Sequence, residues 1–233
     1  MYHSINSNHP ASVRPKDFEK QIKWLKDNYS IVNLWDPLNF QEDSVAITFD
    51  DGYEDNFIYA FPILKKYNCP ATIFVTTGFI KKETDITKQG RLTYTGLRPL
   101  TSEQILEMSK DKISFGSHTH THPVLSKISF GQAASEIIQS KKFLENILNK
   151  SITLFAYPNG QRKDFNASTQ SVLRQNGFLV ALSTIWGDNN KNTPQLVLRR
   201  IRVDAEDSFE DFKNKILGGW DFVGIWQALK SWL

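Results

Sequence analysis

The stretch Val45-Ala46-Ile47-Thr48-Phe49-Asp50-Asp51-Gly52-Tyr53 joins a short apolar run to two adjacent carboxylates and a glycine. A run rich in β-branched and aromatic side chains is typical of a buried strand, so residues 45–49 are predicted to form one. In parallel α/β folds the catalytic groups gather at the carboxyl ends of strands, which is where Asp50 and Asp51 stand. The stretch therefore predicts a parallel α/β fold with acidic side chains at a candidate site.

Similar apolar runs alternate with amphipathic stretches along the chain, which is the pattern of repeated βα units. The further predicted strands are 71–75, 113–116, 152–156, 179–182 and 198–203. The predicted helices are 15–28, 56–67, one that opens with a capping pattern at 101–104, and a long one over about 130–149. Residues 81–99 are expected to form a loop. No repeat or linker interrupts the pattern, so 1–233 is predicted to be a single domain.

The composition limits the function without identifying it. The 233 residues are 40% hydrophobic, enough for a buried core, and 28 basic and 25 acidic residues leave a net charge of +3. No block of like charges resembles a nucleic-acid-binding arm, so no nucleic-acid partner is expected, and a small or carbohydrate ligand is favoured by default. The single cysteine, Cys69, excludes a disulfide within the chain and is expected to be buried.

The opening residues lack the basic and apolar regions of a secretory signal, and no apolar run reaches the length of a membrane span. No stable membrane insertion is therefore expected. A cytoplasmic location is predicted if Met1 is the native start, and a cell-envelope or secreted form if the chain is trimmed. The oligomeric state is not predicted.

A second group of polar residues is Phe115-Gly116-Ser117-His118-Thr119-His120-Thr121-His122-Pro123, again after a short apolar run. Three of the five histidines lie within five residues, and imidazole is a common metal ligand. His118 and His122 can face one ion from a single turn, whereas His120 is expected to point elsewhere.

Together the two groups could supply three protein ligands and an open position for water, with a second carboxylate as general base. Two other interpretations stay open for Asp50 and Asp51. Either could cap a helix that begins near Glu54. An aspartyl-phosphate site is less favoured, because its carboxylates are usually two residues apart and the histidines would have no role.

The runs 48–52 and 118–123 resemble the first two motifs of the polysaccharide deacetylase family, the NodB-homology group, or carbohydrate esterase family 4. The runs 60–64 and 71–75 extend the similarity over nearly the whole chain. The resemblance implies a distorted (β/α) barrel of about seven strands. It also implies a hydrolase that removes acetyl groups from N-acetylated amino sugars in a polysaccharide or glycan.

Carried over by motif, the resemblance implies that Asp51, His118 and His122 bind the metal, most favourably Zn²⁺ with Co²⁺ or Ni²⁺ as alternatives, and that Asp50 is the base. The run 155–160 resembles the third motif, in which a backbone N–H stabilises the oxyanion, here that of Asn159. Tyr157 would line the sugar groove or belong to the core.

The sequence departs from the family pattern at two places. Ala156 stands where the family has an arginine, and the run 198–203 could supply one instead, as a strand with Arg200 and Arg202 on one face. Arg200 is favoured to pair with Asp50, although solvated strand charge is the ordinary interpretation. No histidine follows His122, where many members supply the general acid.

The run 1–5 resembles the opening strand of the poly-N-acetylglucosamine deacetylases of biofilms, which makes His3 the candidate acid. A packed or exposed histidine without a role is the alternative. Trp186, in a loop-like run, is the favoured tryptophan for stacking on a sugar. Two rival functions remain, a catalytically silent carbohydrate-binding module on the same fold and a metal-dependent amidase acting on a non-sugar amide.

Overall fold

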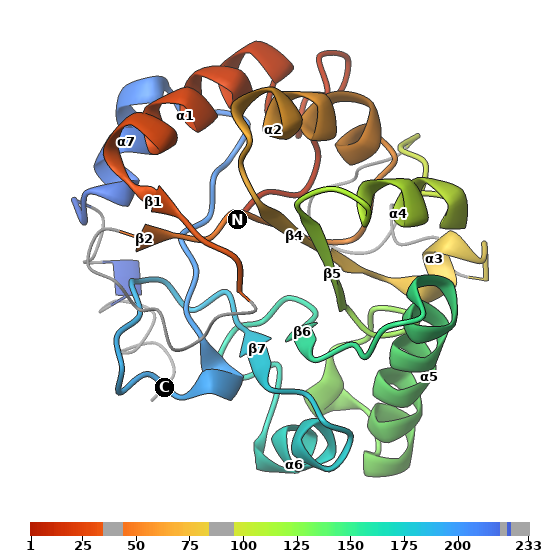
Figure 1. Cartoon of the computed structure of the whole chain (residues 1–233). Helices are drawn as coiled ribbons and strands as arrows, with labels where there is room; N and C mark the ends of the chain where they lie inside the picture. The colour runs from red at the N-terminus through yellow and green to blue at the C-terminus, as the bar shows by residue number, and fades with distance from the viewer. Residues whose placement is uncertain (35–43, 84–95, 220–222, 225–233) are drawn as a thin grey trace.

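The computed structural model describes residues 1–34, 44–83, 96–219 and 223–224. Its centre is a parallel sheet of five strands in the order β3-β4-β5-β6-β7. These strands are β3 (Thr48–Phe49), β4 (Ala71–Val75), β5 (Ile113–Ser117), β6 (Leu154–Ala156) and β7 (Val180–Leu182). A separate parallel pair consists of β1 (Ser30–Ile31) and β2 (Ser44–Val45). The sheet is curled, and helices surround it (Figure 1).

Each α-helix buries at least two of its residues. They are α1 (Pro15–Asn28), α2 (Phe61–Tyr67), α3 (Thr77–Ile80), α4 (Ser102–Met108), α5 (Phe130–Leu148), α6 (Ala167–Gln175) and α7 (Phe209–Ile216), with short turns η1 (Asn56–Ala60), η3 (Leu125–Lys127) and η4 (Gln195–Val197). Capping boxes start α4 at Thr101 and α5 at Ser129, where the hydroxyl and a glutamine side chain satisfy each other's backbone N–H. Pro15 opens α1, as its missing N–H allows.

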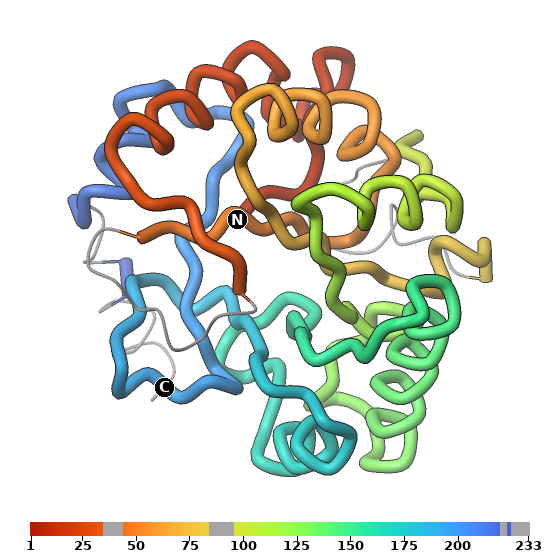
Figure 2. The backbone as a smooth tube through the Cα atoms, viewed as in Figure 1, coloured from red at the N-terminus to blue at the C-terminus, as the bar shows by residue number. Residues whose placement is uncertain are grey.

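Two extended segments close the curled sheet toward a barrel. At one edge, Tyr2 donates its N–H to the Thr48 carbonyl (2.8 Å) and accepts from the Asp50 N–H (3.0 Å). The Val203 N–H then donates to the Met1 carbonyl (3.0 Å), so the second segment lies beside the first. Its other end bridges to β7 through Leu198. The backbone trace in Figure 2 shows these segments, and the arrangement agrees with the distorted (β/α) barrel that the family resemblance implies.

Most predicted elements are confirmed, and two strand predictions need correction. Residues 45–49 divide between β2 and β3. Residues 198–203 form no regular strand, because only Leu198 makes a bridge to β7. The Arg200 N–H donates to the Ile185 carbonyl beyond the end of β7 and the Val203 N–H donates to Met1, so no continuous ladder forms. The helices α6 and α7 were not predicted, although Asn166 and Ser208 cap them. Of the predicted loop at 81–99, residues 84–95 lie outside the described residues.

The core runs through the sheet and the faces of the helices packed on it. Cys69 is 3% exposed, which confirms that it is buried. Gly116 in β5 must lack a side chain, since a Cβ there would lie 2.5 Å from the Phe74 ring and 2.9 Å from the Leu154 carbonyl oxygen. Within the described ranges, no helix has the length and apolar character needed to cross a membrane.

Candidate active site

Asp50 is held by a buried ion pair at the carboxyl end of β3. The two terminal nitrogens of the Arg200 guanidinium donate to the Asp50 carboxylate, Nη1 to Oδ1 at 2.6 Å and Nη2 to Oδ2 at 2.7 Å. Arg200 Nε donates to the Ser183 carbonyl at 2.7 Å, which holds the guanidinium in place against the carboxylate. Burial alone would raise the pKa of Asp50, but the charge of Arg200, helped by His118, holds it well below its ordinary value. Asp50 is therefore ionised at neutral pH.

The chain reverses directly after Asp50, so that the two neighbouring carboxylates point in different directions. Asp51 adopts a left-handed conformation (φ 74°) and Gly52 another (φ 80°). A side chain at Gly52 would press on Val75 at 3.3 Å. The reversal turns Asp51 toward the histidines, while Asp50 faces Arg200. The helix that follows begins at Asn56 without a side-chain cap, so neither aspartate caps it.

Asp51, His118 and His122 converge on one point. Their candidate ligand atoms all lie within 4.8 Å of one another. Asp51 Oδ1 is 3.6 Å from His118 Nε2 and 3.7 Å from His122 Nε2, too long for hydrogen bonds. Two ligands that bind one tetrahedral ion at about 2.0–2.2 Å lie roughly 3.4 Å apart, so the spacing suits a shared ion.

The surroundings of the two imidazoles fit a metal as well. His118 Nδ1 donates to the Ala156 carbonyl at 2.7 Å, which leaves its Nε2 lone pair for a ligand bond. Burial lowers the pKa of His118 and of His122 to about 4, so both are neutral at pH 7. A neutral imidazole is the form that binds a metal ion. Nitrogen, nitrogen and carboxylate oxygen together form a donor set that zinc accepts.

His120 points away from this group. Its ring nitrogens contact Thr77 Oγ1 at 2.9 Å and Glu83 Oε2 at 2.8 Å. Glu136 of α5, which the sequence did not single out, holds the histidine loop by accepting from the backbone N–H groups of His120 (2.9 Å) and Thr121 (2.7 Å). The loop needs this support because two of its residues, Thr119 and His122, have positive φ.

His3 lies beside the same group. It is partly buried, and its charge acts on both Asp50 and His122, lowering the pKa of each. It also lines a small cavity with Arg202, Asp204 and Glu206. Asn159 is exposed after β6 with a φ of 57°, and its carbonyl accepts from Thr184 Oγ1 at 2.5 Å. The roles of both residues stay predictions.

The two aromatic residues predicted to bind sugar are both buried. Tyr157 is 0% exposed, stacks on Phe165 with ring centroids 4.0 Å apart, and donates to the Leu196 carbonyl at 3.0 Å. Trp186 is 7% exposed and packs under Lys215, whose Nζ lies 5.8 Å from its ring centroid. Both rings belong to the core in this structure: for Tyr157 this is one of the two predicted alternatives, and for Trp186 it corrects the prediction of stacking on a sugar.

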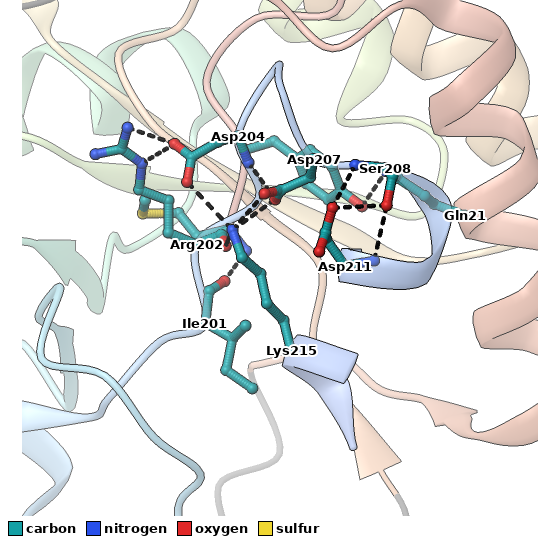
Figure 3. Close-up of polar contacts among 10 residues, drawn as sticks. Gln21, Ile201, Arg202, Asp204, Asp207, Ser208, Asp211 and Lys215 are labelled. Atoms are coloured by element: carbon teal, nitrogen blue, oxygen red, sulfur yellow. Dashed lines mark hydrogen bonds and ion pairs between the residues drawn. The ribbon is translucent and has the colours of Figure 1, made fainter. Parts of the chain in front are cut away.

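The segment that carries Arg200 is anchored from the outside of the barrel. The three arginines of the run diverge, for Arg199 and Arg202 are exposed while Arg200 is buried, so Arg200 and Arg202 do not share a face. Lys215 of α7 is 2% exposed and donates to both Asp207 oxygens at 2.7 and 2.6 Å and to Asp204 at 3.3 Å (Figure 3). This ion-pair network fixes the chain on the far side of Arg200.

Asp55 is a further buried carboxylate that the sequence did not single out. It is 5% exposed and accepts hydrogen bonds from Ser4 Oγ and from the Ile5 N–H (3.3 Å). Burial raises its pKa from 3.8 to about 6, although these hydrogen bonds oppose the shift. The only feature of the sequence that could have indicated a role for Asp55 is its position four residues after Asp51.

Asp55 should make the stability depend on pH between about 4 and 6. Between its ordinary and its raised pKa only the folded chain holds the proton, so its contribution is full at low pH and is lost as the pH rises through about 6. Relative to Asp55→Asn, the native chain should gain about 2.4 kcal/mol of unfolding free energy between pH 7 and pH 4, which is most of the full effect at about 1.4 kcal/mol per pKa unit. Urea unfolding of both proteins across this range measures the gain. A difference that does not change with pH would contradict it.

The site places an ionised, arginine-bound aspartate next to a candidate Asp-His-His metal site at the strand ends of an α/β barrel. Such an arrangement can deprotonate a water while a metal polarises a carbonyl, and it defines a hydrolase of amide or ester bonds.

Comparison with known proteins identifies the family. The family model for polysaccharide deacetylase matches residues 38–181, more than half of the chain. The chain is 34% identical to YxkH of Bacillus subtilis (strain 168), a protein named for this same family, over 87% of this chain and 70% of that protein. It is 30% identical to a poly-beta-1,6-N-acetyl-D-glucosamine N-deacetylase of Staphylococcus aureus (strain MRSA252), over 85% and 70%.

Solved structures agree with these similarities. The Streptococcus pyogenes deacetylase PplD, in complex with acetate, superposes with a TM-score of 0.79 at 28% identity, covering 92% of this chain and 95% of PplD. IcaB from Ammonifex degensii shares the fold with a TM-score of 0.77 at 21% identity, over 96% and 94%. The chain belongs to the polysaccharide deacetylase family and is an N-deacetylase hydrolase.

Proposed function

We propose that this protein is a metal-dependent deacetylase that releases acetate from N-acetylated amino sugars in a glycan. The observation that carries the proposal is the pairing of Asp50 with Arg200 beside the convergent Asp51, His118 and His122. Asp51 and the two histidines would hold a divalent ion, for which Zn²⁺ fits the donor set best and Co²⁺ or Ni²⁺ are alternatives. The bound ion would polarise the acetyl carbonyl and lower the pKa of a water molecule.

Three further residues have separate roles in the proposed reaction. Asp50 accepts the proton of the attacking water, because Arg200 keeps it ionised and in a fixed orientation. The Asn159 N–H donates to the oxyanion that forms on the acetyl carbonyl. His3, on the side of Asp50 and His122, gives a proton to the amine as the C–N bond breaks. The products are acetate and a free amino sugar.

The name of the Staphylococcus aureus relative favours poly-β-1,6-N-acetylglucosamine as the first glycan to test. We expect the chelator-treated protein to lose acetate release from such oligomers by at least about 100-fold and to regain it with one of the three metals. Metal analysis and acetate assays on several N-acetylated oligomers measure this. Oligomer binding without acetate release, with every metal, would support a silent carbohydrate-binding module instead. Release of acid only from non-sugar amides would support an amidase.

A further inference from the structure

A buried polar cluster lies against the segment that carries His3. We define the Asp55 cluster as Ser4, Ser12, Asp55 and Asn56, each at most 5% exposed. Ser4 and Ser12 share a hydrogen bond of 2.5 Å, and Ser4 Oγ also donates to Asp55. The cluster contains no residue of the metal site.

The contacts of this cluster converge on three successive residues of the opening segment. Asn56 Nδ2 donates to the His3 carbonyl at 2.9 Å and to Asp55 Oδ1 at 3.0 Å. Asp55 in turn accepts from the side chain of Ser4 and from the N–H of Ile5 at 3.3 Å. The backbone on both sides of Ser4 is therefore held by two side chains from the start of η1.

In the part of the chain that the structure describes, the opening segment forms no regular strand around His3. Among the described residues, it meets neighbouring backbone through single bridges, Tyr2 to Phe49 and Ile5 to Val13, and not through a regular ladder. The hydrogen bonds of Asp55 and Asn56 hold the backbone between these two bridges, where the Ser4 carbonyl also accepts from the Val13 N–H at 3.2 Å.

Stability alone does not account for a carboxylate at this place. Burial raises the pKa of Asp55 to about 6, so the charge that it carries at neutral pH lowers the stability of the fold. A well-packed apolar residue of similar volume often stabilises a protein more than a buried charged group does. Asp55 also follows Asp51 by only four residues, so one short run supplies the base, a metal ligand and the contacts to the His3 segment.

We propose that Asp55 and Asn56 are positioning residues that hold the His3 backbone, so that its imidazole stays beside Asp50 and His122. This inference rests on the proposed function, in which His3 protonates the departing amine. A displacement of about 1 Å in a reacting group can cost roughly 100-fold in rate, so loss of these contacts acts on turnover through His3.

A double-mutant cycle between Asp55→Ala and His3→Ala tests this role, with kcat, KM and metal content as readouts. We expect His3→Ala to lower kcat by about 100-fold and Asp55→Ala by at least about 10-fold, with KM within about twofold and metal content unchanged. In the His3→Ala background, Asp55→Ala should cause no further loss of kcat. Asp55→Asn keeps an acceptor for the Ile5 N–H, so it should recover most of the activity; it also serves if Asp55→Ala does not fold.

Glu145→Gln is the matched control, because Glu145 also accepts from a backbone N–H, that of Ile152 at 3.1 Å, two residues before β6 and at the end of that strand away from the site. It should leave kcat unchanged. Losses that add fully in the double variant, or a His3→Ala protein with native kcat, would overturn the positioning role. Absence of acetate release by the native protein would overturn the proposed function and this inference with it, which distinguishes the two failures.

Discussion

Replacing Asp50 by Asn should lower kcat by about 10³-fold while the metal content stays near normal. A general base contributes roughly 10²–10⁴-fold to a rate, and an amide cannot accept the proton of the attacking water. Asp50 faces Arg200 and not the convergent ligand atoms, so its loss leaves Asp51 and both histidines in place. Steady-state acetate release and metal analysis of the same preparation measure the two effects.

The adjacent variant Asp51→Asn is the control for this prediction, since the two carboxylates are neighbours in sequence but face different partners. It should lose both metal and activity. Native turnover in Asp50→Asn would exclude Asp50 as the base. Loss of metal from Asp50→Asn would instead place this aspartate among the ligands.

The parts of the fold and site that follow local patterns could be predicted from the sequence. The helix α1 and the strand β4 have the predicted bounds, and the capping pattern at Thr101 opens α4. The sequence could predict that Asp51 lies close to His118 and His122, because parallel strands end at one edge of a sheet. Such inferences depend only on neighbours a few residues apart and on one rule of topology.

The parts that depend on distant contacts could not be predicted. The alternation at 198–203 indicated a strand, but the chain there pairs first with the segment 181–185 and then, through Val203, with Met1, and its arginines diverge. Tyr157 is polar enough to face a groove, yet a carbonyl 39 residues away satisfies its hydroxyl inside the core. The residues next to Glu136 and Asp55 in the sequence do not indicate a supporting role. Only the fold brings these two carboxylates to the backbone N–H groups that they bind.

Replacing Arg200 by Met should reduce kcat by about 100-fold and lower the unfolding free energy by about 3–5 kcal/mol, because it leaves a buried carboxylate without its partner. Arg200→Lys should fall between this variant and the native protein, since an ammonium cannot form the two parallel hydrogen bonds to Asp50. The matched control is Arg199→Met, one residue away and exposed, which should change neither quantity. Native activity in Arg200→Met would contradict the orienting role.

The double variant of Asp50→Asn with Arg200→Met separates stability from catalysis. Removing both members of a buried ion pair costs less than removing one, because no uncompensated charge is left in the core. Urea unfolding should therefore show the double variant to be more stable than Arg200→Met alone, while its acetate release stays as low as that of Asp50→Asn. A double variant that is less stable than Arg200→Met would mean that the loss of stability arises from packing around Arg200 and not from the unpaired buried charge of Asp50.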